Sequence, residues 1–406
     1  MKLKNIDLKH KRVFLRADLN VPLQNQQILQ DHKLNAILPT INYIQENGGK
    51  VILATHLGRP NAQNLTNFFD KDLSTKILLS WFLEREYQIK LERDLEKSVT
   101  LSHEDFGEIL LLENLRFFNG EKGNLEERQN FIEYLKPLAD IYINDAFALI
   151  HRDDTSVTLL PQNFECSKRC WGFLIQKEIT ALNELKDNVK QPFILVVGGN
   201  KIKDKITLLK HFLELEPKNR PCKILIGGAI ANTFLYSQGI EVGKSFIEKD
   251  FVDFIQNFLK QAENKNIKIV LPKDFLTVKE IGQEKLQHHQ KESIPLDEIC
   301  IDIGKTTIKE FEEEIFNAKT IFTNGSMGIY TNPSYQNGTK KILEAISQSN
   351  SYKVAGGGDC VAAIKIFGVQ DKFDFISTGG GATLAYLSTN NPIQNLEALR
   401  VLECKD

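Results

Sequence analysis

The 406-residue sequence lacks several features that would indicate a secreted, membrane or nucleic-acid-binding protein. It has only six cysteines, which is too few for the disulfide framework of a secreted mini-domain. No stretch approaches the roughly 18 consecutive apolar residues of a membrane span, and the start lacks the apolar segment of a signal peptide. The formal net charge of −2 gives no overall field that would attract nucleic acid or a membrane. We therefore expect a cytoplasmic protein with neither kind of partner, in which any anion site is local.

The composition that is present is that of a globular protein with more than one core. Hydrophobic residues make up 42% and charged residues 26%, and a chain of 406 residues predicts two or three domains. Short β-rich runs alternate with segments of helical periodicity such as Leu182–Val189 and Phe251–Ala262, which predicts parallel sheets covered by helices. The predicted strands are Arg12–Arg16, Lys50–Ala54, Glu108–Leu112, Asp140–Asn144, Phe193–Val197, Lys223–Ile226, Lys268–Leu271, Thr320–Thr323, Tyr352–Ala355 and Phe373–Ser377. The segment Glu280–Ile294 is instead expected to be a polar loop or helix surface.

The two halves of the chain differ in the residues that follow their predicted strands. Residues 188–406 contain 18 of the 25 glycines, whereas residues 1–187 contain seven and place cations after the strands. Ligands of open α/β sheets bind at the carboxyl ends of the strands, so the pattern predicts two different ligand sites. The cations of the first half are Arg16, His56, Arg59, Arg116, His151 and Arg152.

The first half has the chemistry of a pocket for a small polyanion. Arginine presents a planar fork of donors that matches phosphate and carboxylate oxygens in two-point contacts. Asp18 and Asn20 would accept hydrogen bonds from a hydroxyl group. Any one of these arginines alone is equally well explained as a surface ion pair. Their repeated position at strand ends favours a binding site.

The second half has the chemistry of a nucleotide phosphate site. Gly357 and Gly358 lead into a helical pattern, where free backbone N–H groups bind phosphate oxygens. Asp359 would face the phosphates and serve Mg²⁺, which takes one or two carboxylates beside phosphate oxygens. Lys201 and Lys205 lie four residues apart and would share one face of a helix, where they could neutralise a transferring phosphoryl group. The alternative is that the glycines form plain turns and the lysines are solvated.

Taken in order, these motifs resemble the phosphoglycerate kinase family over nearly the whole chain. The segment VFLRADLNVP at 13–22 resembles the family signature that follows the first strand. It is followed in family order by HLGRP at 56–60, ENLRF at 113–117, NDAF at 144–147, HR at 151–152, GGNKIKDK at 198–205, GGAIANTF at 227–234, PKD at 272–274, NGSMG at 324–328, GGGD at 356–359 and STGGGA at 377–382.

The resemblance implies two Rossmann-like, doubly wound α/β domains that face a cleft and are joined by a helix. Residues 1–172 would bind 3-phosphoglycerate or 1,3-bisphosphoglycerate, residues 173–187 would form the helix, and residues 188–388 would bind magnesium ADP or ATP. The tail, residues 389–406, would pack back on the first domain. The implied activity is reversible phosphoryl transfer between 1,3-bisphosphoglycerate and MgADP, in a cytoplasmic, monomeric enzyme of glycolysis.

The resemblance also assigns roles to individual residues by their position in the motifs. It implies substrate contacts from Asp18, Leu19, Asn20, Lys33, His56, Leu57, Gly58, Arg59, Arg116 and Arg152. It implies nucleotide contacts from Lys205, Gly228, Asn324, Thr331, Gly357, Gly358, Asp359 and Cys360, with Asp359 as the magnesium ligand. The residues implied to act on the transferring phosphoryl group are Lys33, Lys201, Lys205 and Gly380.

Five positions depart from the family pattern. Lys33 stands where the family has an arginine, which keeps the charge but loses the fork of donors. A second reading therefore stays open, in which the chain is a catalytically weakened relative that binds ligand as a sensor. A hydride-transferring Rossmann enzyme is disfavoured, because no GxGxxG with an acidic partner is present. The other four departures are Thr331 for a ribose-binding glutamate, Ser326 for a proline, Cys360 for a hydroxyl residue, and Asp154 where many members have histidine.

Overall fold

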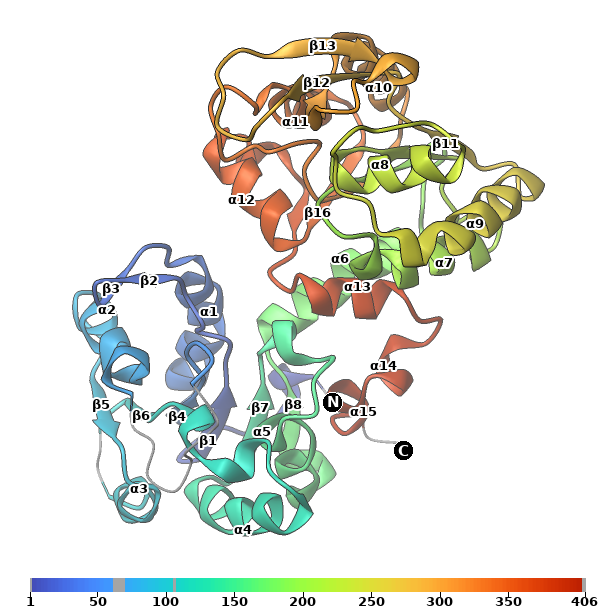
Figure 1. Ribbon diagram of the computed structural model, residues 1–406. Coiled ribbons are helices and arrows are strands. Elements are labelled where there is room, and N and C mark those ends of the chain that lie inside the picture. Colours follow the sequence, from blue (N-terminus) through green and yellow to red (C-terminus); the bar gives the residue numbers. More distant parts are fainter. Residues whose placement is uncertain (1, 61–69, 105–106, 404–406) are drawn as a thin grey trace. The chain divides into compact units, whose positions relative to one another are not determined.

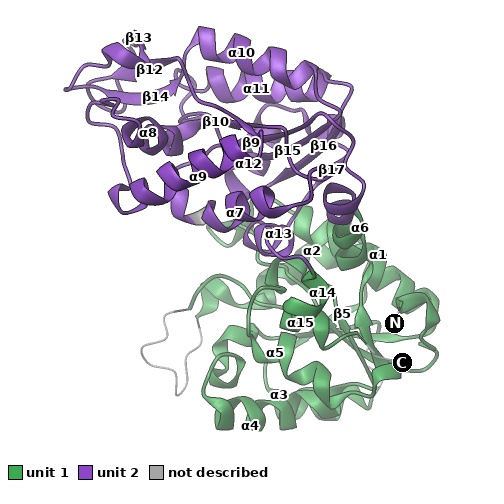
Figure 2. Ribbon diagram, turned by 90° about the vertical axis from the view of Figure 1, so that its right-hand side faces the viewer, with its two compact units in different colours: residues 1–180, 391–406 green, residues 181–390 purple. Residues whose placement is uncertain are grey.

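The computed structural model describes residues 2–60, 70–104 and 107–403, and the chain divides into two compact units. Unit 1 comprises Met1–Thr180 and Asn391–Asp406, and unit 2 comprises Ala181–Asn390 (Figure 2). The boundary between the units falls inside helix α6 (Phe173–Asp187), the segment expected to connect two domains. Within the described ranges, no helix has the length and apolar character needed to cross a membrane.

Unit 1 is built on a sheet of six parallel strands in the spatial order β5-β6-β4-β1-β7-β8 (Figure 1). The strands at its centre are continuous apolar runs, as expected for a parallel sheet that is buried on both faces. In chain order they are β1 (Arg12–Arg16), β4 (Lys50–Ala54), β5 (Ile89–Glu92), β6 (Ile109–Leu112), β7 (Ile141–Asn144) and β8 (Arg169–Trp171).

Side chains alternate between the two faces of this sheet and bury two separate clusters. Val13 and Leu15 of β1 join one cluster, whereas Phe14 between them joins the other. The first cluster includes residues of α1 (His32–Glu46) and α2 (Leu79–Leu83), and the second includes residues of α4 (Leu125–Leu135). The sheet is therefore covered on both sides. The remaining elements of unit 1 are the hairpin β2 (Leu23–Gln24) and β3 (Gln27–Ile28), α3 (Leu95–Ser102), α5 (Thr155–Thr158), α14 (Pro392–Asn395) and α15 (Glu397–Arg400).

Unit 2 repeats the architecture with a second sheet of six parallel strands, in the order β11-β10-β9-β15-β16-β17. Its strands are β9 (Phe193–Val197), β10 (Lys223–Ile226), β11 (Lys268–Val270), β15 (Thr320–Asn324), β16 (Tyr352–Gly356) and β17 (Phe375–Ile376). Its helices are α7 (Ile206–Glu214), α8 (Gly228–Ser237), α9 (Val252–Asn264), α10 (Lys305–Phe316), α11 (Asn337–Gln348), α12 (Gly358–Ile366) and α13 (Gly381–Leu387). The predicted fold class, two doubly wound parallel-sheet domains, is confirmed by this pair of sheets.

A third, antiparallel sheet corrects the expectation for residues 280–294. Strand β13 (Gln287–Gln290) lies in that segment and pairs with β12 (Asp274–Val278), which pairs in turn with β14 (Ile299–Ile303). β13 has no apolar pattern, and its two histidines instead make polar contacts with neighbouring acids. His288 Nε2 lies 2.7 Å from Asp274 Oδ2, and His289 Nε2 lies 3.1 Å from Glu298 Oε2. Sequence periodicity alone gives no sign of a strand that is stabilised in this way.

Candidate functional site

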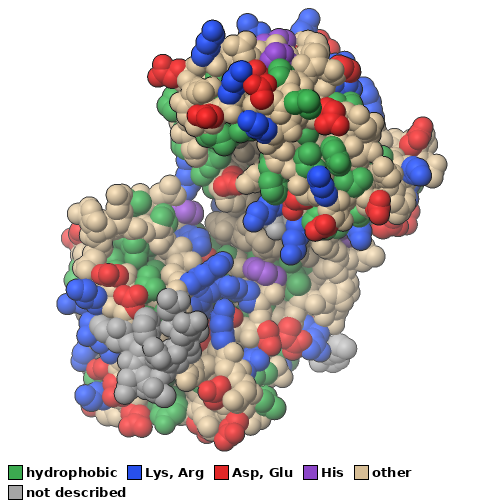
Figure 3. Space-filling model, viewed as in Figure 1, with side chains coloured by type: hydrophobic (Ala, Val, Ile, Leu, Met, Phe, Trp, Pro, Cys, Tyr) green, Lys and Arg blue, Asp and Glu red, His purple; other side chains and the backbone are tan. Residues whose placement is uncertain are grey.

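The predicted cations of unit 1 follow neighbouring strands of one parallel sheet. Strands β6, β4, β1 and β7 are adjacent in that order, so their carboxyl ends lie along the same edge. Arg116, His56 and Arg152 lie in the segments that follow β6, β4 and β7, and Asp18 follows β1. Figure 3, in the same view as Figure 1, shows Lys and Arg side chains gathered on one face of this unit.

Lys33 is held by Asp18. Its Nζ donates to Asp18 Oδ2 at 2.6 Å, and the side chain of Asp18 is almost fully buried. Lys33 lies in the first turn of α1, so the helix holds its backbone in a defined position. Lys33, which departs from the family arginine, thus lies in a defined place against a predicted substrate residue.

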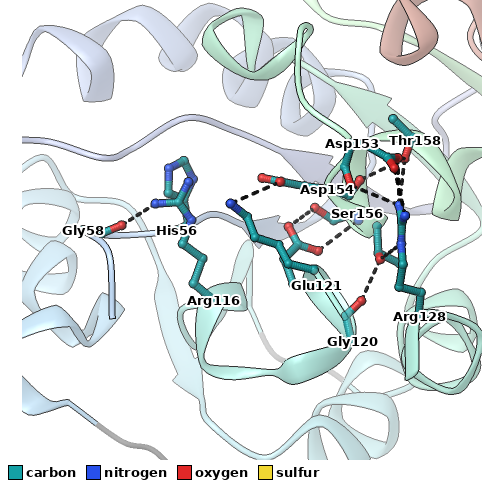
Figure 4. A network of polar contacts seen from close by, with 12 residues as sticks. His56, Gly58, Arg116, Gly120, Glu121, Arg128, Asp153, Asp154, Ser156 and Thr158 are labelled. Atoms are coloured by element: carbon teal, nitrogen blue, oxygen red, sulfur yellow. Dashed lines mark hydrogen bonds and ion pairs between the residues drawn. The ribbon is translucent and has the colours of Figure 1, made fainter. Parts of the chain in front are cut away.

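A chain of hydrogen bonds joins three of the predicted motifs. Asn20 Oδ1 accepts from the backbone N–H of Gly58 at 2.8 Å, and the Gly58 carbonyl accepts from Arg116 Nη1 (Figure 4). Gly58 has φ of +58°, a left-handed conformation that a side chain at this position would strain. The glycine of HLGRP is therefore required to bring Asn20 and Arg116 to the same loop.

Arg116 has donors to spare. Its Nε and Nη2 atoms are buried and have no hydrogen-bond partner among the residues that the structure describes. Burial, followed by the nearby positive charge of Arg152, lowers the pKa of Arg116 to about 10, so the group remains charged at neutral pH. Buried donors without partners are rare in proteins, and a pair on one guanidinium matches an oxyanion. This side chain is suited to receive an anion that the protein itself does not supply.

His56 is a neutral member of the same cluster. Its side chain is buried, and its Nδ1 lies 3.5 Å from Nη2 of Arg16. Burial, and then the charges of Arg16, Arg116, Arg152 and Lys33, hold the pKa of His56 well below its usual range. His56 therefore offers a hydrogen bond to a ligand, without a charge, at neutral pH.

Arg16 serves the fold, although it was expected beside the other strand-end cations. It is completely buried, and it donates to Ser156 Oγ at 2.7 Å and to the Ala17 carbonyl at 2.6 Å. Its Nη2 also lies 3.4 Å from Glu121 Oε1, in a buried ion pair. Arg16 is the last residue of β1, whereas Arg59, Arg116 and Arg152 follow the ends of their strands by several residues. Residue type alone did not separate Arg16 from these other arginines.

The other predicted substrate residues differ in what they expose. The side chains of Leu19 and Leu57 are buried in the hydrophobic core, so only their backbone groups remain for a ligand. Arg59 is exposed and Arg152 is half-buried. The candidates with contacts in the described cluster are Asp18, Asn20, Lys33, His56, Gly58 and Arg116, and the charge of Arg152 acts on His56 and Arg116.

Unit 2 has a polar cavity of about 260 Å³ at the carboxyl ends of β9, β15 and β16. It brings together residues from three separate motifs, at 198–205, 324–328 and 356–359. Lys201 and Lys205 both line it, but not from one helical face as expected: Lys201 precedes the short turn η11 (Ile202–Asp204) and Lys205 precedes α7. The cavity is lined by Gly199, Asn200, Lys201, Lys205, Asn324, Gly325, Gly357, Gly358 and Asp359.

Asn324 contacts another residue of this cavity and leaves one donor without a partner among the described residues. Its Oδ1 accepts from Lys205 Nζ, and its buried Nδ2 has no hydrogen-bond partner within the described residues. A Cβ atom at Gly357 would meet Asn324 Nδ2 at 2.9 Å, and Gly357 has φ of +90°. Gly357 must therefore be glycine for α12 to begin here, with Asp359 in its first turn. Free N–H groups, a lysine and a carboxylate are the usual components of a magnesium–phosphate site.

Two further cavities adjoin the polar one. A cavity of about 360 Å³ shares Gly199, Asn200 and Asp359 with it, and is lined by Gly228, Ser326 and Thr331 together with apolar residues that include Phe275, Ile301 and Met327. Its lining suits a flat heterocycle beside polar phosphates. The second, of about 540 Å³, places Gly380 with Lys205, Gly357, Gly358 and Asp359.

Cys360 is a predicted nucleotide residue whose side chain is not accessible to a ligand. It is buried, and its Sγ lies 3.9 Å from both the hydroxyl and the carbonyl oxygen of Thr323. Burial raises the pKa of its thiol to about 11. Only the backbone N–H of Cys360, at the start of α12, remains for a phosphate, so replacing a hydroxyl residue by Cys at this position need not remove a contact.

Comparisons with known proteins give a consistent result. A sequence model of the family described as phosphoglycerate kinase matches residues 3–390. The phosphoglycerate kinase of Dictyoglomus turgidum is 39% identical over 393 residues, which cover 95% of this chain and 94% of that protein. That of Bdellovibrio bacteriovorus is 38% identical over 401 residues, covering 98% and 96%.

Solved structures agree with the sequence relatives. The structure of phosphoglycerate kinase from Coxiella burnetii matches with a TM-score of 0.84 at 31% identity, covering 99% of this chain and 98% of that chain. The corresponding structure from Pyrococcus horikoshii matches with a TM-score of 0.81 at 29% identity, with the same coverage.

Proposed function

This chain belongs to the phosphoglycerate kinase family and is a phosphotransferase; from that premise we propose which residues of each unit bind its substrates. The reaction is reversible transfer of a phosphoryl group between 1,3-bisphosphoglycerate and ADP, which gives 3-phosphoglycerate and ATP. Unit 1 binds the phosphoglycerate and unit 2 the nucleotide. The observation that carries this division is the pair of unpartnered, buried donors on Arg116 in unit 1, against the glycine-lined cavity of unit 2.

In unit 1, cations bind the two anionic ends of the substrate. Arg116 donates from Nε and Nη2 to a phosphate, with Arg59 and Arg152 beside it, and neutral His56 adds a hydrogen bond. Asp18 and Asn20 lie on the loop after β1, where their oxygens can accept from the substrate hydroxyl. Lys33, restrained by Asp18, stabilises the acyl phosphate end.

In unit 2, the cavity of about 360 Å³, here called the apolar cavity, takes the nucleotide base. The polar cavity of about 260 Å³ takes the phosphates. Backbone N–H groups at Gly357, Gly358 and Cys360 face the phosphates from the start of α12. Gly228, Ser326 and Thr331 line the apolar cavity. Thr331 has a short side chain, so it offers the ribose a weaker contact than a carboxylate would.

The residues present fit a magnesium ion that is bound together with the nucleotide. Asp359 lines each of the three cavities described above and offers one carboxylate to them, and Mg²⁺ in kinases takes most of its other ligands from phosphate and water. Among the described residues there is no group of three or more metal-ligating side chains, as expected if the nucleotide completes the coordination. When bound, the ion would neutralise phosphate charge.

The chemical step is direct transfer dominated by electrostatics. A β-phosphate oxygen of ADP attacks the acyl phosphorus, and the carboxylate of 3-phosphoglycerate leaves. Lys201, Lys205 and Lys33 supply positive charge to the transferring group, with Gly380 lining the cavity beside them. No covalent enzyme intermediate is needed. We further propose that the enzyme is cytoplasmic and monomeric, as is usual in the family.

A coupled assay with 3-phosphoglycerate and magnesium ATP tests this function. We expect turnover in the ordinary enzyme range of about 1–10³ per second. Folded protein that binds nucleotide but gives no turnover would support the alternative of a catalytically weakened, ligand-sensing relative, and would contradict the catalytic role proposed for Lys33.

A further inference from the structure

Lys122 lies at the anion-binding edge of unit 1 but has no part in the function proposed above. It follows the short turn η6 (Asn119–Glu121), six residues after Arg116. Its Nζ lies 3.6 Å from Asp154 Oδ1, and the lysine side chain is 49% exposed whereas that of Asp154 is 4% exposed. A half-exposed cation is therefore paired with a buried carboxylate two residues after Arg152.

Asp154 is unusual for a carboxylate close to an anion site. It is buried, and its Oδ2 has no hydrogen-bond partner in the part of the chain that the structure describes. A buried carboxylate that is not compensated is costly, and repels an incoming anion. The ammonium of Lys122 is the cationic partner of Asp154. We therefore infer that the carboxylate of Asp154 serves to keep Lys122 close to the site.

Lys122 belongs to the same electrostatic cluster as the two arginines. Burial lowers the pKa of Lys122, Asp154 opposes that effect, and the charges of Arg116 and Arg152 lower it further. The pKa of Arg116 responds in turn to Arg152 and to Asp154. Lys122, which contacts Asp154, is therefore close enough to Arg116 to feel the charge of the side chain that keeps two donors without partners among the described residues.

The neighbouring acid makes a different kind of pair. Asp153 accepts from Arg128 Nη1 and Nη2, both at 2.9 Å, and Arg128 Nε donates to Thr155 at 2.8 Å (Figure 4). These donors are committed to the protein, which is the pattern of a structural ion pair. The 3.6 Å contact of Lys122 is longer than a strong charge-assisted hydrogen bond, and an ammonium has three N–H donors. Lys122 can thus keep Asp154 as a partner and still donate to a ligand.

We propose that Lys122 is a further substrate-binding residue, whose ammonium contacts the phosphate group of 3-phosphoglycerate, and that Asp154 is the residue that positions it. This inference rests on the substrate site proposed for unit 1. It gives Asp154, where many relatives have histidine, a role other than repelling the substrate: the acid holds a lysine that brings an additional positive charge.

Calorimetric titration of 3-phosphoglycerate into the full chain tests the proposal. Lys122→Ala should weaken binding by about tenfold, the size expected for one charge-assisted hydrogen bond, and should leave ADP binding unchanged. Inorganic phosphate, used as a competitor, should lose affinity in the same variant. Lys168→Ala is the matched control, since Lys168 is also 49% exposed and pairs with Glu165 at 3.0 Å on the same unit.

Asp154→Asn should change the affinity for 3-phosphoglycerate in opposite directions, depending on whether Lys122 is present. With Lys122 present, the substitution releases the lysine and should weaken 3-phosphoglycerate binding by a few-fold. In the Lys122→Ala background only repulsion remains to be removed, so Asp154→Asn should strengthen binding. Thermal unfolding of each variant verifies that the protein is folded.

Three results would overturn the proposal. Unchanged binding in Lys122→Ala removes the lysine contact, and unchanged phosphate competition removes its assignment to the phosphate end. Tighter binding in Asp154→Asn with Lys122 present shows that the acid only repels. Arg116→Ala separates this from the function proposed for unit 1: if that variant also binds 3-phosphoglycerate normally, the substrate site itself is misplaced.

Discussion

The two units have the same architecture, but their candidate sites differ in the groups that they offer to an anion. Each is a doubly wound sheet of six parallel strands with its candidate site at the carboxyl ends. The candidate site of unit 1 has long cationic side chains, such as Arg116 and Lys33, which hydrogen bonds to neighbouring groups hold in place. The candidate site of unit 2 is instead lined by glycines with positive φ, such as Gly199 and Gly357, and by the start of helix α12.

The difference is explained by the ligands that we propose for each unit. A small acid with an anionic group at each end leaves little to grip except charge, so the protein must supply several separate cations. A nucleotide has a base that can be buried in an apolar cavity, and its phosphates can be held by helix N-termini and a metal. The same fold thus fits either ligand through a change in the loops at the carboxyl ends of its strands.

The sharpest way to break this comparison is to remove the carboxylate of unit 2. Asp359→Ala should reduce the affinity for magnesium ADP by about 10³-fold or more, since the phosphates lose their metal anchor. Binding of 3-phosphoglycerate should be unchanged. Titration of each ligand separately measures both effects. Loss of both binding events in a folded variant would show that the units do not bind separate ligands.

The reciprocal change is Arg116→Ala in unit 1. It removes two charge-assisted hydrogen bonds to the proposed phosphate, each of about 1.5–3 kcal/mol, so kcat/KM for 3-phosphoglycerate should fall by about 10³-fold. The affinity for ADP should not change. Arg116→Lys is the control that keeps the charge and loses the fork, and it should recover only part of the loss. Full activity in Arg116→Ala would contradict the assignment of the phosphate to this side chain.

Sequence reasoning succeeded where one signal determines the structure. The central strands, such as β1 and β9, are continuous apolar runs and were predicted to within a residue or two. The strands β5, β8 and β13 were missed, because they are short, partly polar and stabilised by cross-strand contacts. Periodicity reports burial, and these strands are only partly buried.

The candidate sites show the same limit. Motif order was enough to predict which residues gather, and the structure does bring Asn20, Gly58 and Arg116 together. Their roles remain predictions. Sequence could not show that Arg16 turns into the core toward Glu121, or that Lys122 lies beside Asp154, since both depend on residues far apart in the chain. Ion pairs of this kind have no local signature.

Each unit also contains a buried aspartate that should make the stability of the protein depend on pH, which is a smaller effect than those above. Burial raises the pKa of Asp302 in unit 2 to about 7 and that of Asp145 in unit 1 to about 6. Each folded-state pKa lies above the unfolded value, so between about pH 4 and the raised pKa the native state binds more protons. Stability therefore falls as the pH rises through that window, and the window of Asp302 extends to higher pH.

The substitution Asp302→Asn should remove the pH dependence of stability that Asp302 causes. Asp302 Oδ2 accepts from the Gly338 N–H at 2.5 Å, which an amide oxygen can replace, whereas Oδ1 has no partner among the described residues. Asp302→Asn should stabilise the protein at pH 8 by about 2–3 kcal/mol and flatten the pH profile of urea unfolding. Asp145→Asn should gain less, because Thr40 and the Ile175 N–H already compensate both oxygens. A loss of stability at pH 8 in Asp302→Asn would show that the charged form is favoured.

Restoring the family arginine at position 33 is the mildest change and the one that most sharpens the comparison. Lys33 already makes a 2.6 Å contact with Asp18, so its charge is in place and only the planar fork is missing. Lys33→Arg can keep Asp18 as a partner and direct further donors to the acyl phosphate, which should raise kcat by about tenfold while KM for ADP stays constant. Stopped-flow measurement of the transfer step, with Lys168→Arg as a surface control, separates chemistry from product release. An unchanged or lower rate would mean that Asp18 already holds Lys33 productively, and that unit 1 depends on the position of its charge rather than on the shape of the group carrying it.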